Sequence, residues 1–110
     1  MKNDILKARN SAIIEGISYR VVFKTKGSTY KIYMVDEKIK CIKNVKMKHI
    51  RIDGTNFLKD EFYYRASGAP SKGGRIKLVS QNDTYDMTIQ VATGRVMLTK
   101  VTGKKGDVYE

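Results

Sequence analysis

The chain has 110 residues, 41% hydrophobic and 30% charged, which is the composition of a soluble globular protein and excludes a disordered chain. This length supports one modest hydrophobic core but not two. The 22 lysines and arginines outnumber 11 acidic residues, and the formal charge of +11 favours polyanionic partners: nucleic acid, acidic polysaccharide or an anionic lipid surface. The alternative is that lysines only keep a β-rich domain soluble, because lysine discourages pairing between exposed strand edges.

One amphipathic helix is predicted over residues 3–16. No proline or interior glycine interrupts it, and its apolar residues recur at spacings of three and four: Ile5, Leu6, Ala8, Ala12, Ile13 and Ile17. Asn3 or Asp4 can cap the first amides, and Gly16 stands where a left-handed residue ends many helices. Arg9 is expected on the side that faces water.

About seven or eight short strands are predicted between residues 17 and 100, because β-branched and aromatic residues alternate with polar ones between turn-forming clusters. The segments 17–25 and 29–35 are expected to form a hairpin across a glycine turn. A change of phase near His49 predicts a bulge or a short loop. The pattern predicts an α+β domain, with the helix packed on antiparallel strands in two small sheets or one bent sheet. The basic tail, 101–110, is expected to be loosely held.

The sequence offers little for catalysis or metal binding. The one cysteine, Cys41, rules out an internal disulfide, and its alternation with Ile39 predicts a buried small hydrophobe. No pattern orients the one histidine, His49, toward Cys41, and two such residues supply too few ligands for a metal cluster. Asp60 and Glu61 are neighbours on a strand, so they point to opposite faces. The chain is therefore predicted to be no enzyme and to need no cofactor.

Two sets of basic residues are candidate contacts for DNA or another polyanion. The first set combines the C-terminal strands with the tail: Arg75, Arg95, Lys100, Lys104 and Lys105. The second set is a predicted stripe in which lysines share a strand face: Lys38, Lys40, Lys46 and Lys48. Three tyrosines are candidates for stacking on exposed bases: Tyr33, Tyr63 and Tyr64. The alternative to the stripe is a solvated outer face over buried apolar residues: Ile39, Ile42, Met47 and Ile52.

An ordered set of glycine signals marks the C-terminal third. Residues 67–74 read Ser-Gly-Ala-Pro-Ser-Lys-Gly-Gly before a strand, and Thr93, Gly94 and Arg95 turn the chain into the last strand. With the N-terminal helix, the hairpin rich in Tyr and Val, and the strand around Phe62, this order resembles the globular domain of the GspH/FimT family of minor pilins and type II secretion pseudopilins. The resemblance implies one pilin-like domain spanning the whole chain, 1–110.

The resemblance also implies a structural role. A family member is a minor subunit of a type IV pilus-like, competence or type II secretion filament, acts in assembly initiation or at the tip, and has other pilin or pseudopilin subunits as partners. Members begin with a basic leader and about twenty apolar residues, the length of a membrane span. We therefore expect the full-length protein to carry such a helix ahead of residues 3–16, to be anchored in the membrane before assembly, and to be exposed at the cell surface afterwards.

Some family members that act in natural transformation bind DNA through a Gly-Arg-x-Arg turn and a basic tail. Gly94 and Arg95 match the start of this turn, but Met97 stands at the second arginine, so only half of the motif carries over. Lys104 and Lys105 can compensate, because phosphate contact needs charge more than a fixed residue, and binding would be independent of sequence. A third hypothesis, a free-standing cytosolic nucleic-acid-binding β domain, requires the native reading frame to begin at the first residue.

Overall fold

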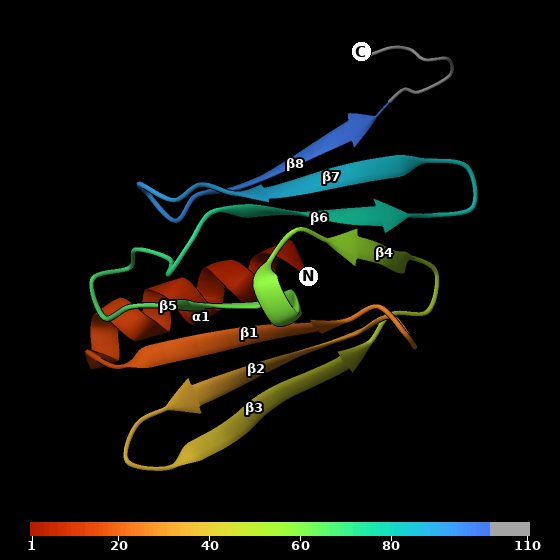
Figure 1. The fold of residues 1–110 in the computed structure, drawn as a ribbon. Helices are drawn as coiled ribbons and strands as arrows, with labels where there is room; N and C mark the ends of the chain where they lie inside the picture. Colours follow the sequence, from red (N-terminus) through yellow and green to blue (C-terminus); the bar gives the residue numbers. More distant parts are fainter. Residues whose placement is uncertain (102–110) are drawn as a thin grey trace.

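The computed structural model describes residues 1–101, and the strands in this part form two antiparallel four-stranded sheets (Figure 1). Its elements are α1 (Lys2–Glu15), β1 (Ser18–Lys24), β2 (Thr29–Val35), β3 (Ile39–Lys46), β4 (Arg51–Thr55), the 3-10 helix η1 (Leu58–Asp60), β5 (Glu61–Tyr64), β6 (Gly74–Val79), β7 (Thr84–Ile89) and β8 (Val96–Val101). Sheet A has the order β3-β2-β1-β5 and sheet B the order β4-β6-β7-β8. The predicted α+β fold with two small sheets is confirmed. The predicted tail lies, except for Val101, outside the described residues.

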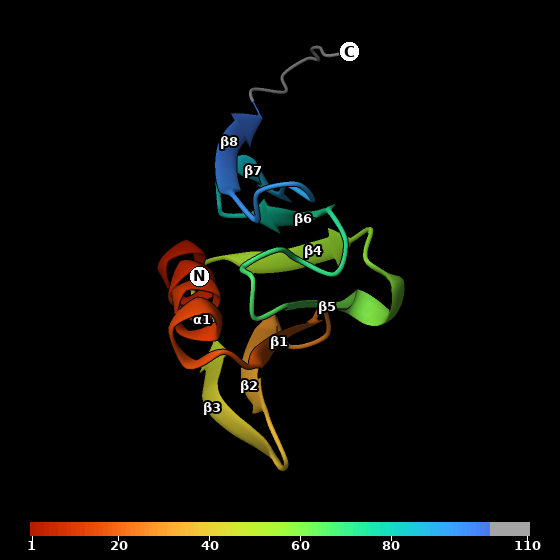
Figure 2. The same cartoon turned by 90° about the vertical axis from the view of Figure 1, so that its left-hand side faces the viewer.

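Helix α1 lies on the inner side of both sheets, where it contacts β1, β5 and β8 (Figure 2). Alternate residues of β1 point toward it and are buried: Tyr19, Val21 and Phe23. Sheet B contributes its own buried inner positions, such as Ile76 and Met87. This period-2 burial follows from the pleat of a strand, and it leaves the other face of each sheet exposed on the side away from α1.

The ends of α1 differ in how well the sequence predicted them. Gly16 adopts φ +70° and its N–H donates to the Ala12 carbonyl at 2.9 Å, so the predicted left-handed stop is confirmed. The predicted cap is wrong, because the N-cap residue is Met1 and no side chain caps the first amides. The Asp4 carboxylate instead points to the sheet. Two apolar residues of the last turn stay exposed: Ile13 at 44% and Ile14 at 82%.

Asp4 ties the first turn of α1 to sheet A. The Tyr30 hydroxyl on β2 donates to Asp4 Oδ2 at 2.5 Å, and Lys43 Nζ on β3 lies 3.3 Å from Oδ1. Burial raises the pKa of Asp4, but the hydrogen bonds from Tyr30 and Lys43 and the Lys43 charge outweigh burial and hold that pKa below its ordinary value. Burial and the Asp4 carboxylate together raise the pKa of Tyr30.

The substitution Asp4→Asn is expected to cost about 1 kcal/mol at neutral pH, the size of a hydrogen bond to a partly solvated charge. Because the folded pKa of Asp4 is depressed, its contribution is present above the ordinary value of 3.8 and is lost as the pH falls through the folded pKa. Urea unfolding of both proteins at about pH 7 and about pH 3 measures this difference. A gap that stays constant or widens in acid would contradict the assignment.

Strand β3 is exposed along almost its whole length, contrary to the sequence prediction. Cys41, expected to be buried, is exposed, as are Ile39 at 60% and Ile42 at 47%. The physical reason is position: β3 is the edge strand of sheet A, and its register places Ile39 and Cys41 opposite Val35 and Tyr33, on the face away from α1. Ile52, on β4, is buried as predicted, and Met47 is half-buried.

Candidate functional site

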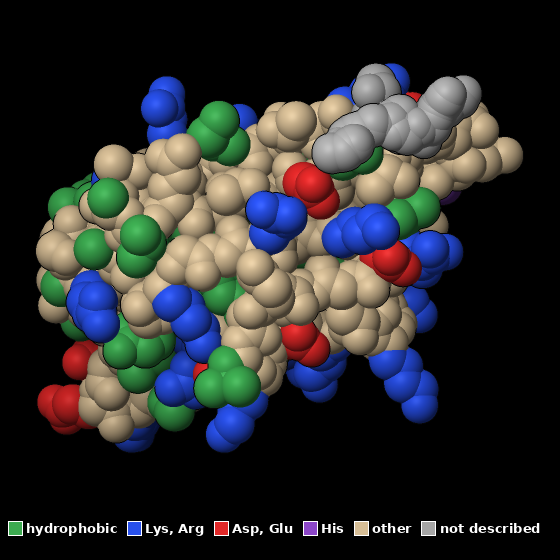
Figure 3. Space-filling model, turned by 45° about the horizontal axis from the view of Figure 1, so that its top comes forward, with side chains coloured by type: hydrophobic (Ala, Val, Ile, Leu, Met, Phe, Trp, Pro, Cys, Tyr) green, Lys and Arg blue, Asp and Glu red, His purple; other side chains and the backbone are tan. Residues whose placement is uncertain are grey.

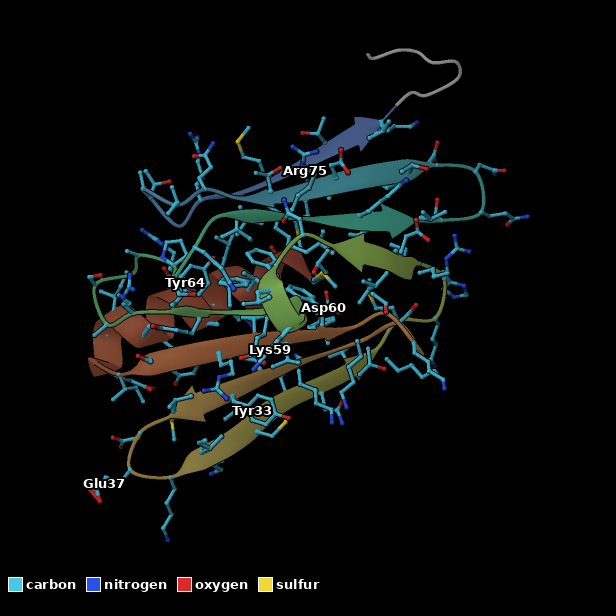
Figure 4. The ribbon with its side chains drawn as sticks, in the orientation of Figure 1. Tyr33, Glu37, Lys59, Asp60, Tyr64 and Arg75 are labelled. Carbon is cyan, nitrogen blue, oxygen red and sulfur yellow. The ribbon has the colours of Figure 1, made fainter. Side chains whose placement is uncertain are left out.

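The first predicted set centres on the outer face of sheet B. Arg75, on β6, is exposed and pairs in register with Thr88 of β7 (Figure 4). Its neighbour Ile76 is fully buried in the core. Arg95 is exposed in the turn before β8, where its carbonyl accepts from the Gln90 N–H at 2.9 Å. The structure therefore brings Arg75 and Arg95 to the same side of this sheet.

Lys100 starts from the other face of sheet B, although it lines a hollow together with Arg75. It pairs in register with Tyr85, which packs against the core, so it belongs to the opposite face of sheet B. Its Nζ lies 3.2 Å from Asp83 Oδ1 in an ion pair. Lys104 and Lys105 lie outside the described residues. The predicted set is thus only partly assembled within residues 1–101.

The outer side of sheet B carries an open hollow of about 960 Å³ with charges of both signs. Its lining includes the basic residues Arg75, Lys77 and Lys100 and the acidic residues Asp83 and Asp86. Lys77 Nζ lies 3.8 Å from the Asp53 carboxylate. In Figure 3, which brings this side forward, lysine and arginine side chains stand apart from one another and alternate with acidic and apolar ones. Positive charge is therefore partly neutralised here.

The second predicted set is divided by a bulge. The register of β2 with β3 shifts between Ile32 and Tyr33, so Lys40 pairs with Met34 whereas Lys46 pairs with Thr29. Met34 and Thr29 are an odd number of residues apart in a regular strand, which places Lys40 and Lys46 on opposite faces of sheet A. The two remaining members, Lys38 and Lys48, are exposed and lie just outside β3. The lysines do not form one continuous stripe.

The three tyrosines also separate. Tyr64 is fully buried and its hydroxyl donates to the Gly94 carbonyl at 3.1 Å, so the prediction that it stacks on bases is wrong. Burial raises the pKa of Tyr64, with the nearby Arg9 charge opposing. Tyr33 and Tyr63 point to the outer face of sheet A, where both pair in register with Arg20 of β1. Tyr63 is 38% exposed and Tyr33 is half-buried, so these two rings are the ones accessible from this face.

Comparisons with known proteins identify the fold. No protein-family model and no curated protein matches the sequence. Among solved structures, the chain resembles the minor pseudopilin EpsH from the type 2 secretion system of Vibrio cholerae, with a TM-score of 0.70 and 12% identity over 90% of each chain. It also resembles the type IV minor pilin FimU of Pseudomonas aeruginosa, with a TM-score of 0.70 and 10% identity over 92% of this chain and 91% of that one. This chain has the minor-pilin fold.

The glycine signals that suggested the minor-pilin fold have a structural cause. Arg9, expected to face water, is half-buried, and its Nε donates to the Gly68 carbonyl at 3.2 Å. A Cβ on Gly94 would lie 2.5 Å from the same carbonyl oxygen and 3.1 Å from the Tyr64 ring. Gly68 and Gly94 have φ of +90° and +74°. These contacts hold α1, the β5–β6 loop and the β7–β8 turn together. That these three segments meet was not predicted from the sequence.

Residues 1–101 of this minor-pilin fold contain no candidate metal cluster. In that part of the chain no group of three or more His, Cys, Asp or Glu is arranged to hold a metal ion. Cys41 and His49 are both exposed, on β3 and in the loop after it. Within the same residues no helix is both long enough and apolar enough to cross a membrane.

Proposed function

We propose that the chain is the globular domain of a minor subunit in a type IV pilus-like, competence or type II secretion filament. The observation that carries this proposal is the match of fold over 90% of both chains to a minor pseudopilin, together with a similar match to a minor pilin. In this proposal the subunit acts in assembly initiation or at the tip. It packs against other pilin or pseudopilin subunits, and the full-length protein is anchored in the membrane before assembly.

The exposed side of α1 is the proposed packing surface. Exposed residues follow one another along this side at spacings of three and four: Asn3, Lys7, Asn10 and Ile14. The exposed fraction of Ile14 is 82%, although isoleucine is normally buried. An interface that covers this side chain would gain apolar burial while the sheets' outer faces remain turned away from it (Figure 2).

The test compares two exposed apolar residues on different sides of the domain. In cells that carry the gene, Ile14→Lys is expected to lower the amount of the subunit in sheared filaments at least about tenfold, because it buries an unpaired charge at the interface. Leu58→Lys is the matched control, since Leu58 is 73% exposed on η1, across the sheets from α1 (Figure 2). Immunoblots of the filament fraction and gold labelling of filament ends measure incorporation. Equal incorporation of the two variants would contradict the proposed surface, and absence of the wild-type subunit would contradict the function.

Sequence-independent DNA binding is the second candidate, in a DNA-uptake filament or as a free-standing cytosolic domain. The placement of Arg75 and Arg95 on one side of sheet B and the formal charge of +11 favour it. The mixed charges of the sheet B hollow do not. The arginines of this sheet therefore serve as a comparison in the binding experiment below.

A further inference from the structure

The outer face of sheet A carries a row of planar side chains that the register sets side by side. Arg20 of β1 is the central residue: it pairs with Tyr33 of β2 on one side and with Tyr63 of β5 on the other. Arg65 lies two residues after Tyr63 and therefore on the same face, and its guanidinium carbon lies 5.7 Å from the centre of the Tyr63 ring. Tyr33, Arg20 and Tyr63 thus lie in one row across three neighbouring strands, and Arg65 lies beside the end of this row, next to Tyr63 (Figure 4 labels Tyr33).

This face is also the more one-sided of the two in charge. Among the described residues, five basic side chains belong to it by register or phase, against one acidic side chain, Glu61: Arg20, Lys24, Lys31, Lys46 and Arg65. Glu61 Oε2 lies 3.8 Å from Arg20 Nε, so this ion pair partly neutralises one of the five positive charges, that of Arg20. The acidic residues Asp36 and Glu37 belong to the β2–β3 turn, beyond the end of the strands (Figure 4).

We propose that this face, which we call the tyrosine–arginine face, binds single-stranded nucleic acid. Tyr33 and Tyr63 would each stack on a base, and the Arg20 guanidinium would stack on the base between them. The surrounding lysines would contact phosphates. Neighbouring strands are about 4.8 Å apart, so β2 and β5, which carry the two tyrosines, are about 10 Å apart, a distance that an extended nucleic-acid chain covers with one intervening base. A duplex has its base faces stacked internally and offers nothing to these rings.

Apolar residues around the row favour bases over a ligand that offers charge alone. Val22 and Val35 belong to the same face by register, and the edge residue Ile39, which pairs with Val35, is 60% exposed. A base covers such surface with a flat apolar ring, whereas a sulfated or uronic-acid glycan presents hydrated hydroxyls to it. The face lies on the side of sheet A away from α1, so packing of α1 into a filament would leave it accessible. The binding experiment does not depend on that filament role.

The first experiment separates stacking from charge. Fluorescence anisotropy is measured with a labelled single strand of about twelve nucleotides, its duplex, an abasic strand of the same length and charge, and heparin as an acidic glycan. The single strand is expected to bind about tenfold or more tightly than the abasic strand, and affinity for both is expected to fall with salt. Equal affinity for the two strands, or tighter binding of duplex or heparin, would overturn the proposal.

Variants then assign the preference to the face. The double substitution Tyr33→Leu with Tyr63→Leu is expected to remove the preference for bases over the abasic strand, whereas Tyr33→Phe with Tyr63→Phe, which keeps both rings, retains it. Arg75→Ala with Arg95→Ala is the matched control on sheet B and is expected to leave the preference unchanged. If Arg75→Ala with Arg95→Ala abolishes the preference for bases, or if the double leucine variant retains this preference, the tyrosine–arginine face is not the site. Circular dichroism confirms that each variant is folded, and if the leucine pair unfolds, Tyr33→Leu and Tyr63→Leu are each measured alone and each is expected to reduce the preference.

Discussion

Replacing Phe57 by alanine is expected to lower the free energy of unfolding by about 3–5 kcal/mol, the range for removing a phenyl ring from a close-packed core. Phe57 is 4% exposed although it lies in the loop between β4 and η1. Its ring stacks on Phe62 at a centroid distance of 4.9 Å and on Phe23 at 6.3 Å. It also packs directly against Gly74 of β6, so it joins sheet A to sheet B. Its loss would open a cavity where the two sheets meet.

The neighbouring residue provides the control. Leu58 is 73% exposed, and Leu58→Ala is expected to change the free energy of unfolding by no more than about 0.5 kcal/mol. Urea unfolding of the three proteins under one set of conditions gives both differences. Similar losses for the two substitutions would show that Phe57 does not pack in the core as described. A large loss confined to Leu58→Ala would show the same.

Sequence periodicity predicted those elements whose neighbours bury one face. The helix expected at 3–16 runs over Lys2–Glu15, and the hairpin expected at 17–25 and 29–35 became β1 and β2. Both segments face the core, so burial imposes a clear spacing of three to four on the helix and of two on the strands. The helix stop at Gly16 was also predictable, because it is a local backbone requirement.

Edge position and register were not predictable, because other segments decide them. The alternation of Ile39 and Cys41 is typical of a half-buried strand, but β3 is an edge strand whose register places these two residues on the outer face of sheet A. A single extra residue at the β2–β3 bulge then reverses which face each later side chain takes. This is why Lys40 and Lys46 separate and why the predicted stripe does not form.

The tyrosine–arginine face was within reach of the sequence only in part. Tyr33 and Tyr63 were candidates for stacking, but their distance along the chain gives no sign that both pair with Arg20. That adjacency depends on β5 joining the edge of β1, a pairing between segments about forty residues apart. Long-range strand pairing of this kind leaves no local pattern in composition or periodicity. The Arg9 hydrogen bond to Gly68, which links residues 59 apart, was missed for the same reason.

Replacing Gly94 by alanine is expected to cost about 2–4 kcal/mol, because two effects add. Gly94 has φ +74°, a conformation that costs an L-residue about 1 kcal/mol. The new methyl would also lie 2.5 Å from the Gly68 carbonyl oxygen and 2.9 Å from Arg9 Nε. To relieve that contact, the β7–β8 turn must move away from Gly68 and strain the hydrogen bond from Arg9 to the Gly68 carbonyl.

Two other glycines separate the two effects. Gly16 has φ +70°, and a methyl group added there would meet no atom within 4 Å, so Gly16→Ala is expected to cost about 1 kcal/mol from the backbone alone. Gly54 has neither a left-handed backbone nor a close neighbour, and Gly54→Ala is expected to change stability by no more than about 0.5 kcal/mol. Thermal and urea unfolding should therefore show the largest loss of stability for Gly94→Ala, a smaller loss for Gly16→Ala and the smallest for Gly54→Ala. If Gly94→Ala cost no more than Gly16→Ala, the described close contact between the β7–β8 turn and the Gly68 carbonyl would be contradicted. Other contacts would then have to hold α1 to this turn.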